Sequence, residues 1–220
     1  MTSFPNRRQL LAAAVCIAMS GCASVKPVPY SGIASSSYLS PSKHSSRVPY
    51  RYDTAVSWRS YQKMIIDPVT VYQGPDNQFG NMREEDKTAL ASYMQNAFAG
   101  KLGKRFELVN EPGPGTLRLK LTLTGAKTTT AVLGTFTKFD IGGGMYNSVQ
   151  AIRGREGLMN GSVIYSVEIY DALSHQLLSA YITKQYPNAM NVGASFGALK
   201  AARVGIDKGA NALAEQLRMP

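Results

Sequence analysis

The residue with the clearest chemistry is Cys22, because its surroundings predict that its thiol carries a lipid. Two arginines stand near the start of the chain, and an apolar run over residues 10–19 follows them. Small residues then lead directly to the cysteine. A basic start, a short apolar run and small residues before a cleavage point form an export signal. A cysteine at that point is typical of bacterial lipoproteins, so we expect residues 1–21 to be a signal peptide and Cys22 to be the lipidated N-terminus.

The length of the apolar run limits the alternatives. A helix that crosses the hydrocarbon core needs about 20 apolar residues, so this run is too short to span a membrane. An ordinary secretory signal cut near Ala23 is the remaining alternative. Two or three acyl chains, palmitate among them, contribute about 0.8 kcal/mol per buried CH₂ and hold a protein stably on a membrane. We therefore expect a lipid-anchored protein.

The other residues that could do chemistry do not form a catalytic set. His44 and His175 have no cysteine, aspartate or second histidine at the spacing of a metal site or a catalytic triad. The carboxylates 84–86 are consecutive, which suits the first turn of a helix better than acid/base chemistry. The glycines 142–144 lack the flanking strand and helix of a phosphate-binding loop. We expect no enzymatic activity, no cofactor and no metal.

Composition indicates a basic protein without disulfides. The 220 residues carry a formal charge of +10, and removal of residues 1–21 lowers it to +8. Cys16 leaves with the signal and Cys22 is modified, so no thiol remains for a disulfide or a metal site. Export argues against nucleic acid as the partner. Anionic lipid headgroups, anionic envelope polymers or an acidic protein face are expected instead, and a generally basic solvated surface is the alternative.

Residues 22–49 are rich in serine and proline and are expected to form a tether from the lipidated cysteine. Such a tract has too little apolar surface to offset its ordering entropy. Tyr30, Tyr38 and Leu39 are exceptions that could fix parts of it to the domain. At about 3.3 Å per residue the tether could reach several tens of ångströms and hold the domain away from the membrane.

A single domain is expected over residues 50–220. Residues 64–72 are rich in β-branched side chains and predict a strand, in which Pro68 marks an edge, a bulge or a break. Asn81 and Glu84 form a capping-box spacing, so a helix is expected from there to Leu102.

Further strands are expected over 106–109 and 117–124, and a hairpin over 161–185. A second helix is expected to be capped by Ser195. Its apolar stripe consists of Phe196, Leu199, Ala202, Ile206, Ala210, Leu213 and Leu217. This order predicts an α+β two-layer domain, with a mixed or antiparallel sheet of about five strands and both amphipathic helices on one face.

Residues 126–160 form a Gly/Thr-rich insert that is too irregular for a predicted element and too apolar for a linker. We expect it to dock onto a partner or membrane surface, and the alternative is a long hairpin or loop packed over the sheet. Its candidate contact residues are Lys138, Phe139, Tyr146, Arg153 and Arg155.

Several of these runs resemble one family of bacterial lipoproteins. The likeness lies in Tyr61 to Tyr72, with its Asp-Pro-Val motif, in Glu-Pro-Gly-Pro-Gly at 111–115, and in the leucine strand that follows. It continues through the terminal hairpin and helix, and it is to the family catalogued as domain of unknown function 3313. The resemblance implies a fold and an envelope location, and it implies no catalytic residues.

Together these patterns predict a lipid-anchored accessory or binding module that acts on a periplasmic protein or an envelope polymer. Ala23 after Cys22, in place of aspartate, predicts sorting to the periplasmic face of the outer membrane, with the inner membrane as the alternative. A structural component of an oligomeric secretion or pore assembly is the second hypothesis. An enzyme acting on cell wall or lipid is the third.

Overall fold

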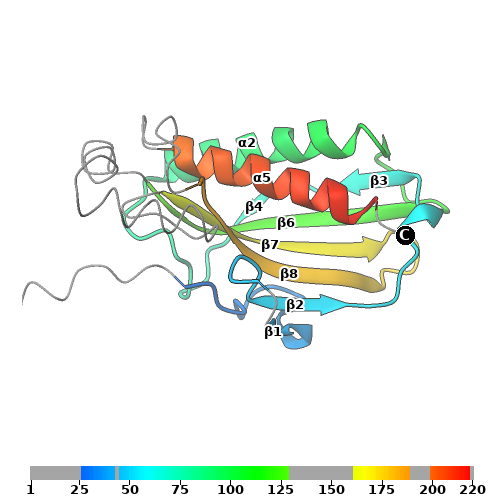
Figure 1. Cartoon of the computed structure of the whole chain (residues 1–220), viewed down its shortest axis with the longest axis horizontal. Coiled ribbons are helices and arrows are strands. Elements are labelled where there is room, and N and C mark those ends of the chain that lie inside the picture. The colour runs from blue at the N-terminus through cyan, green and yellow to red at the C-terminus, as the bar shows by residue number, and fades with distance from the viewer. Residues whose placement is uncertain (1–25, 43–44, 129–160, 189–198, 219–220) are drawn as a thin grey trace, which may run out of the picture.

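The computed structural model describes residues 26–42, 45–128, 161–188 and 199–218, and its α+β architecture places both helices over one face of a mixed sheet (Figure 1). The strands are β1 Ser40–Pro41, β2 Tyr50–Asp53, β3 Lys63–Ile66, β4 Thr70–Val71, β5 Glu107–Leu108, β6 Thr116–Lys127, β7 Ser162–Asp171 and β8 Leu177–Gln185. The helices are α2 Glu84–Leu102 and α5 Lys200–Gln216, with short 3-10 turns η1 Ser36–Tyr38 and η2 Trp58–Ser60. The class is as expected, but the described sheet has eight strands, not about five.

The sheet order is β1-β2-β8-β7-β6-β3-β5, with β4 also beside β6. The predicted hairpin is present as the antiparallel pair β7 and β8, and β6 pairs antiparallel with β7. The predicted strand 64–72 is divided into β3 and β4, which both run parallel to β6. Pro68 lies in the break between them, as its missing N–H predicts. The added strands are short segments with too few residues for an alternating pattern.

The main core lies between the sheet and the helices. The four leucines of β6, at 117, 119, 121 and 123, are at most 1% exposed and pack with the apolar side chains of α2 and α5. Gly205 and Gly209 let α5 approach the sheet closely. A Cβ atom at Gly209 would overlap the Tyr165 hydroxyl oxygen. The two glycines therefore set the height of α5 above the sheet.

The helix starts differ from those expected. α2 begins at Glu84, but Arg83 occupies the N-cap position and makes no side-chain capping hydrogen bond, so the predicted cap at Asn81 is wrong. The acidic first turn and the end at Leu102 are confirmed. α5 begins at Lys200, and the predicted cap Ser195 lies outside the described residues.

Residues 26–42, which we call the strap, cover part of the opposite face of the sheet, and their last residues form the edge strand β1. Tyr30 is fully buried and Ile33 is 5% exposed. They pack with Ile164 of β7, with Ile182 of β8 and with Tyr72, which directly follows β4. The sequence predicts a tether here. The structure differs because the outward face of the hairpin also carries apolar side chains, which supply a surface that the strap can bury.

Hydrogen bonds fix the strap in one register. The Ser35 N–H donates to the Glu168 carboxylate at 2.8 Å, and the Gly32 N–H donates to the Tyr72 hydroxyl oxygen at 3.1 Å. The Tyr72 hydroxyl in turn donates to Asp76 at 2.6 Å. This bond is the main reason that the pKa of Asp76 lies below its ordinary value. The strap is therefore held by both apolar and polar contacts.

Candidate functional site

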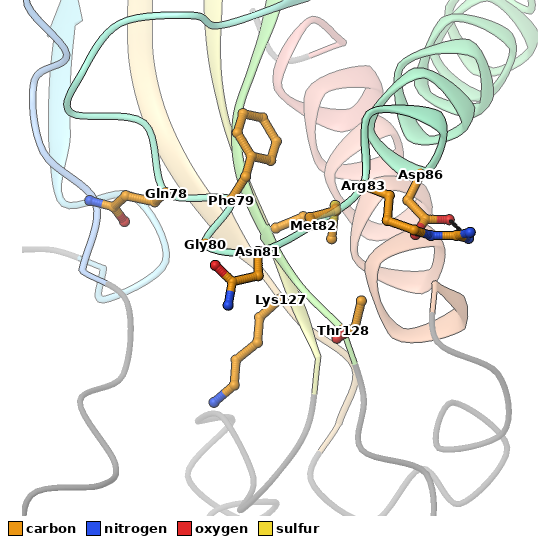
Figure 2. A pocket seen from close by; sticks show the side chains of 10 residues that line it. Gln78, Phe79, Gly80, Asn81, Met82, Arg83, Asp86, Lys127 and Thr128 are labelled. Atoms are coloured by element: carbon orange, nitrogen blue, oxygen red, sulfur yellow. Dashed lines mark hydrogen bonds and ion pairs between the residues drawn. The ribbon is translucent and has the colours of Figure 1, made fainter.

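A pocket of about 480 Å³ lies at one end of the sheet, between the loop Gln78–Arg83 and the last residues of β6 (Figure 2). We call this the pocket end; β6 ends there, β7 begins there and β8 ends there. The far end carries the β7–β8 turn. The loop and the end of β6 are about 45 residues apart in the sequence, so the pocket forms only because the fold brings them together.

A parallel bridge between Gln78 and Gly125 holds the loop against the sheet. The Gln78 N–H donates to the Thr124 carbonyl oxygen at 2.8 Å. Gly125 is required for this approach, since a Cβ atom there would lie 2.8 Å from the Gln78 carbonyl oxygen. Gly80 adopts φ of 55°, a conformation that favours glycine, and turns the chain back towards α2. The loop is thus shaped by its own residues and by the glycine that faces it.

The pocket has an apolar floor and a polar rim. Phe79, which is 4% exposed, and Ala126 form part of the floor. Asn81 and Lys127 lie exposed on the rim, and Figure 2 shows both side chains directed away from the floor. Such a combination of apolar surface with a few polar groups is typical of binding sites for small molecules or short segments.

Charges at the rim are partly neutralised within the helix start. The Arg83 guanidinium lies 3.2 Å from the carboxylates of both Glu85 and Asp86, and Figure 2 shows the contact with Asp86. The hydrogen bond to Asp86 raises the pKa of Arg83. The Lys87 ammonium pairs with Glu84 at 2.6 Å and lies 4.9 Å above the Phe79 ring. The consecutive carboxylates therefore serve the helix start, where they complement the dipole and bind neighbouring cations.

The strap begins at this pocket. The Gln78 side-chain amide donates to the Lys26 carbonyl oxygen at 2.6 Å. Lys26 is four residues after Cys22, the predicted lipidation site, which lies outside the described residues. The start of the domain is therefore tied to the loop that forms the pocket.

The predicted insert leaves the domain at the same end. Lys127 pairs with Ser162 in the β6–β7 register, and the described residues that flank the gap are Thr128 and Gly161. The candidate contact residues of the insert, Lys138, Phe139, Tyr146, Arg153 and Arg155, all lie outside the described residues. The first residues of the predicted insert, Ala126 and Lys127, are part of β6, which corrects its start, and they line the pocket with Thr128.

The remaining sequence candidates are not brought together. His175 is exposed in the β7–β8 turn at the far end, with a φ of 58°, and His44 lies outside the described residues, as do the glycines 142–144. Within the described part of the chain, no group of three or more His, Cys, Asp and Glu side chains could hold a metal ion. None of its helices has the length and apolar character of a membrane span.

A second cavity of about 410 Å³ lies between α5 and the strands β2 and β8. Arg51, Tyr181 and Glu215 are among its lining residues, and the Arg51 guanidinium lies 5.6 Å from the centroid of the Tyr181 ring. Sequence reasoning missed both cavities. For the second cavity, the sequence signal was the pair Gly205 and Gly209 in α5, because small residues on a helix indicate that it closely approaches a neighbouring element.

Comparisons with known proteins give one family and a distant likeness in structure. The family model described as "Protein of unknown function (DUF3313)" matches residues 29–213, which confirms the resemblance drawn from the sequence. Among solved structures, a dodecamer of PelC from Paraburkholderia phytofirmans has a TM-score of 0.39 and 10% identity, over 74% of this chain and 94% of that one. A dodecamer of a single-residue variant of PelC has a TM-score of 0.38 and 10% identity, over 77% and 96%. No curated protein matches the chain.

Proposed function

The chain belongs to the DUF3313 family of proteins of unknown function, and we propose that it is a lipid-anchored, non-enzymatic binding module of the cell envelope. In this proposal Cys22 carries the lipid, and the anchor lies in the periplasmic face of the outer membrane. The pocket end binds an envelope protein or an anionic envelope polymer. The observation that supports it best is the hydrogen bond from Gln78 to Lys26, because it joins the start of the strap to the pocket.

The chemistry of the pocket supports binding. Its floor offers apolar contact through Phe79, while Asn81 supplies an amide and Lys127 a cation at the rim. An amide donates and accepts hydrogen bonds, and an ammonium group attracts carboxylates or phosphates. A ligand with an apolar part and an anionic or hydrogen-bonding part fits this arrangement.

The insert would enlarge this surface. Its two ends are adjacent, since Lys127 and Ser162 are paired across β6 and β7. The insert therefore follows Thr128, which lines the pocket, and precedes Ser162 on the neighbouring strand. The insert residues Lys138, Phe139, Tyr146, Arg153 and Arg155 are proposed to add aromatic and cationic contacts to the same partner.

In-cell photocrosslinking tests the proposal. A photoreactive amino acid replaces Asn81 at the pocket rim of the full-length protein, and in a matched variant it replaces Leu173, which is 54% exposed at the far end. We expect a discrete adduct from position 81 and none from position 173. Equal adducts from both positions, or an adduct from position 173 alone, would contradict a binding site at the pocket end.

Two controls separate the parts of the proposal. The Cys22→Ser variant should leave the membrane fraction and lose the adduct at position 81, because the proposed function depends on where the domain is held. A variant that stays in the membrane and keeps its adduct would count against the anchor. Native mass measurement of the detergent-solubilised protein addresses the second hypothesis, since a closed ring would favour a structural role in an oligomeric assembly.

A further inference from the structure

We infer that the pocket end lies against the anionic headgroups of the membrane that holds the anchor, so that the pocket opens at the membrane surface. This inference rests on the proposed function, because it takes Cys22 as the lipidated residue. It goes further by assigning the orientation of the domain and the surface that its pocket end contacts.

The length of chain between the lipid and the domain carries the first step. The strap is packed against the sheet from Lys26 onward, with Tyr30 fully buried four residues later. Only four residue steps separate Cys22 from Lys26. Fully extended, they span at most about 14 Å, whereas a free tether over 22–49 would span roughly 90 Å. The docked strap therefore converts a long tether into a short one.

The short connection selects one end of the molecule. Lys26 is bound at the pocket through Gln78, so the pocket stays within this short reach of the membrane. The far end is removed from it by the length of β7, whose nine residue steps from Ser162 to Asp171 extend about 30 Å. The pocket end is consequently the part of the domain that the anchor holds close to the lipid headgroups.

Charge at the pocket end is partly balanced within the protein. Three carboxylates, those of Glu84, Glu85 and Asp86, pair with two cations, Lys87 and Arg83. Asp76 accepts hydrogen bonds from the Tyr72 hydroxyl and the Ser31 N–H.

Three lysines at the pocket end are available to lipid. Lys26 starts the strap, Lys127 ends β6 and Lys200 begins α5, which starts at this end of the sheet (Figure 1). All three are exposed, and within the described part of the chain they have no ion-pair partner. The attraction of such cations to an anionic surface decays over about 10 Å, a distance comparable to the reach of the connection. Because the far end also carries lysines, the short connection determines the orientation, and the charge at the pocket end only strengthens it.

Site-specific quenching by lipid tests the orientation. The predicted mature chain has no free thiol, so Asn81→Cys and Leu173→Cys each supply a single site for a fluorescent label. The lipidated full-length protein is placed in vesicles of phosphatidylethanolamine and phosphatidylglycerol that contain a lipid with a spin-labelled headgroup. We expect the label at position 81 to be quenched several-fold more than the label at position 173. Trp58 is the only tryptophan and precedes β3, which begins beside the start of β6 at the far end, so it should be unquenched.

Two further variants examine the cause. A twelve-residue Gly/Ser insertion between Cys22 and Lys26 adds a root-mean-square reach of about 20 Å and should reduce the difference between the two labels. Replacing Lys26, Lys127 and Lys200 by glutamine should weaken quenching at position 81 on anionic vesicles and leave it unchanged on phosphatidylcholine vesicles.

Mass measurement of the N-terminal peptide separates the two possible failures. An unmodified Cys22 would overturn the proposed function and this inference together. A lipidated Cys22 with equal or stronger quenching at position 173, or with no quenching at either position, would overturn the inference and leave the anchor intact.

Discussion

Replacing Tyr30 by alanine removes the side chain that fixes the strap to the sheet. The ring is fully buried among Ile164, Ile182 and Tyr72, and its centroid lies 5.4 Å from that of Tyr72 in an edge-to-face arrangement. If the strap is part of the folded domain, this truncation must lower the free energy of unfolding. If the strap is a tether, the same truncation must have almost no effect.

The magnitude follows from the burial. Truncation of a fully buried aromatic residue to alanine costs about 3–5 kcal/mol, through lost transfer free energy and the cavity that remains. Tyr30→Phe is the matched control, because it keeps the ring and removes only the hydroxyl. Burial of that hydroxyl raises the pKa of Tyr30 to about 12. Removing it should change the free energy of unfolding by no more than about 1 kcal/mol.

Urea unfolding of the full-length protein in detergent provides the measurement, followed by the fluorescence of Trp58 and by far-ultraviolet circular dichroism. Trp58 packs in the core on the helix side of the sheet, so its signal reports the stability of the whole domain and not of the strap alone. We expect both probes to give the same midpoint, lowered in Tyr30→Ala and unchanged in Tyr30→Phe. A loss below about 1 kcal/mol in Tyr30→Ala would refute the docked strap, and with it the short connection to Cys22.

Two further predictions concern the hairpin and the helix packing. The Ser174 N–H donates to Asp171, and this bond is the main reason that the pKa of the Asp171 carboxyl lies below its ordinary value. The ionised carboxylate therefore stabilises the fold above the unfolded pKa of about 4, and this stabilisation is lost as the pH falls through the folded pKa. Asp171→Asn should therefore be less stable than the natural chain near neutral pH, and urea unfolding should show the difference shrinking in acid; a difference that is independent of pH would contradict the charge argument. Gly209→Ala should destabilise the protein by about 1–3 kcal/mol, because its Cβ atom meets the Tyr165 hydroxyl, whereas Gly100→Ala on the exposed face of α2 should stabilise it by about 0.5–1 kcal/mol. Thermal unfolding of both variants gives the comparison, and a tolerated Gly209→Ala would mean that α5 can move away from the sheet.

Much of the fold was predictable because its signals are local. The leucines of β6 alternate, the residues of β7 and β8 alternate around a turn, and the apolar positions of α2 and α5 recur at helical spacing. Each pattern records which side of an element faces the core. The cap of α2 was predicted wrongly because Asn81 serves the loop of the pocket, and the helix starts after Arg83 without a side-chain cap. The strand count was too low because β1 and β2 were not expected and because the predicted strand 64–72 is divided into β3 and β4. β1 and β4 have only two residues each, and pairing alone defines such strands. β5 corresponds to the predicted strand 106–109.

The candidate site was less predictable. The insert was singled out from its composition; its first residues, Ala126 and Lys127, belong to β6 and line the pocket, and residues 129–160 lie outside the described residues. The pocket joins Gln78 and Lys127, and Gln78 in turn binds Lys26, so the three residues are separated by about 50 residues at each step. No pattern within a short window links such positions, because their contact depends on the register of the β6–β7 pair and on the path of the strap.

The sequence by itself determined the helices and the central hairpin and predicted the lipid anchor, since each depends on neighbouring residues. The sequence marked Tyr30, Tyr38 and Leu39 as possible points of attachment in the serine- and proline-rich segment, and only the tertiary structure decided that Tyr30 is buried on the sheet while Tyr38 is 54% exposed. Tyr30 and Ile33 are isolated apolar residues in a polar tract, and their burial is favourable only because Ile164 and Ile182 offer a matching surface on the outward face of the hairpin. That long-range match brings the start of the strap to the pocket, where Lys26 is four residue steps from Cys22, the predicted lipidation site.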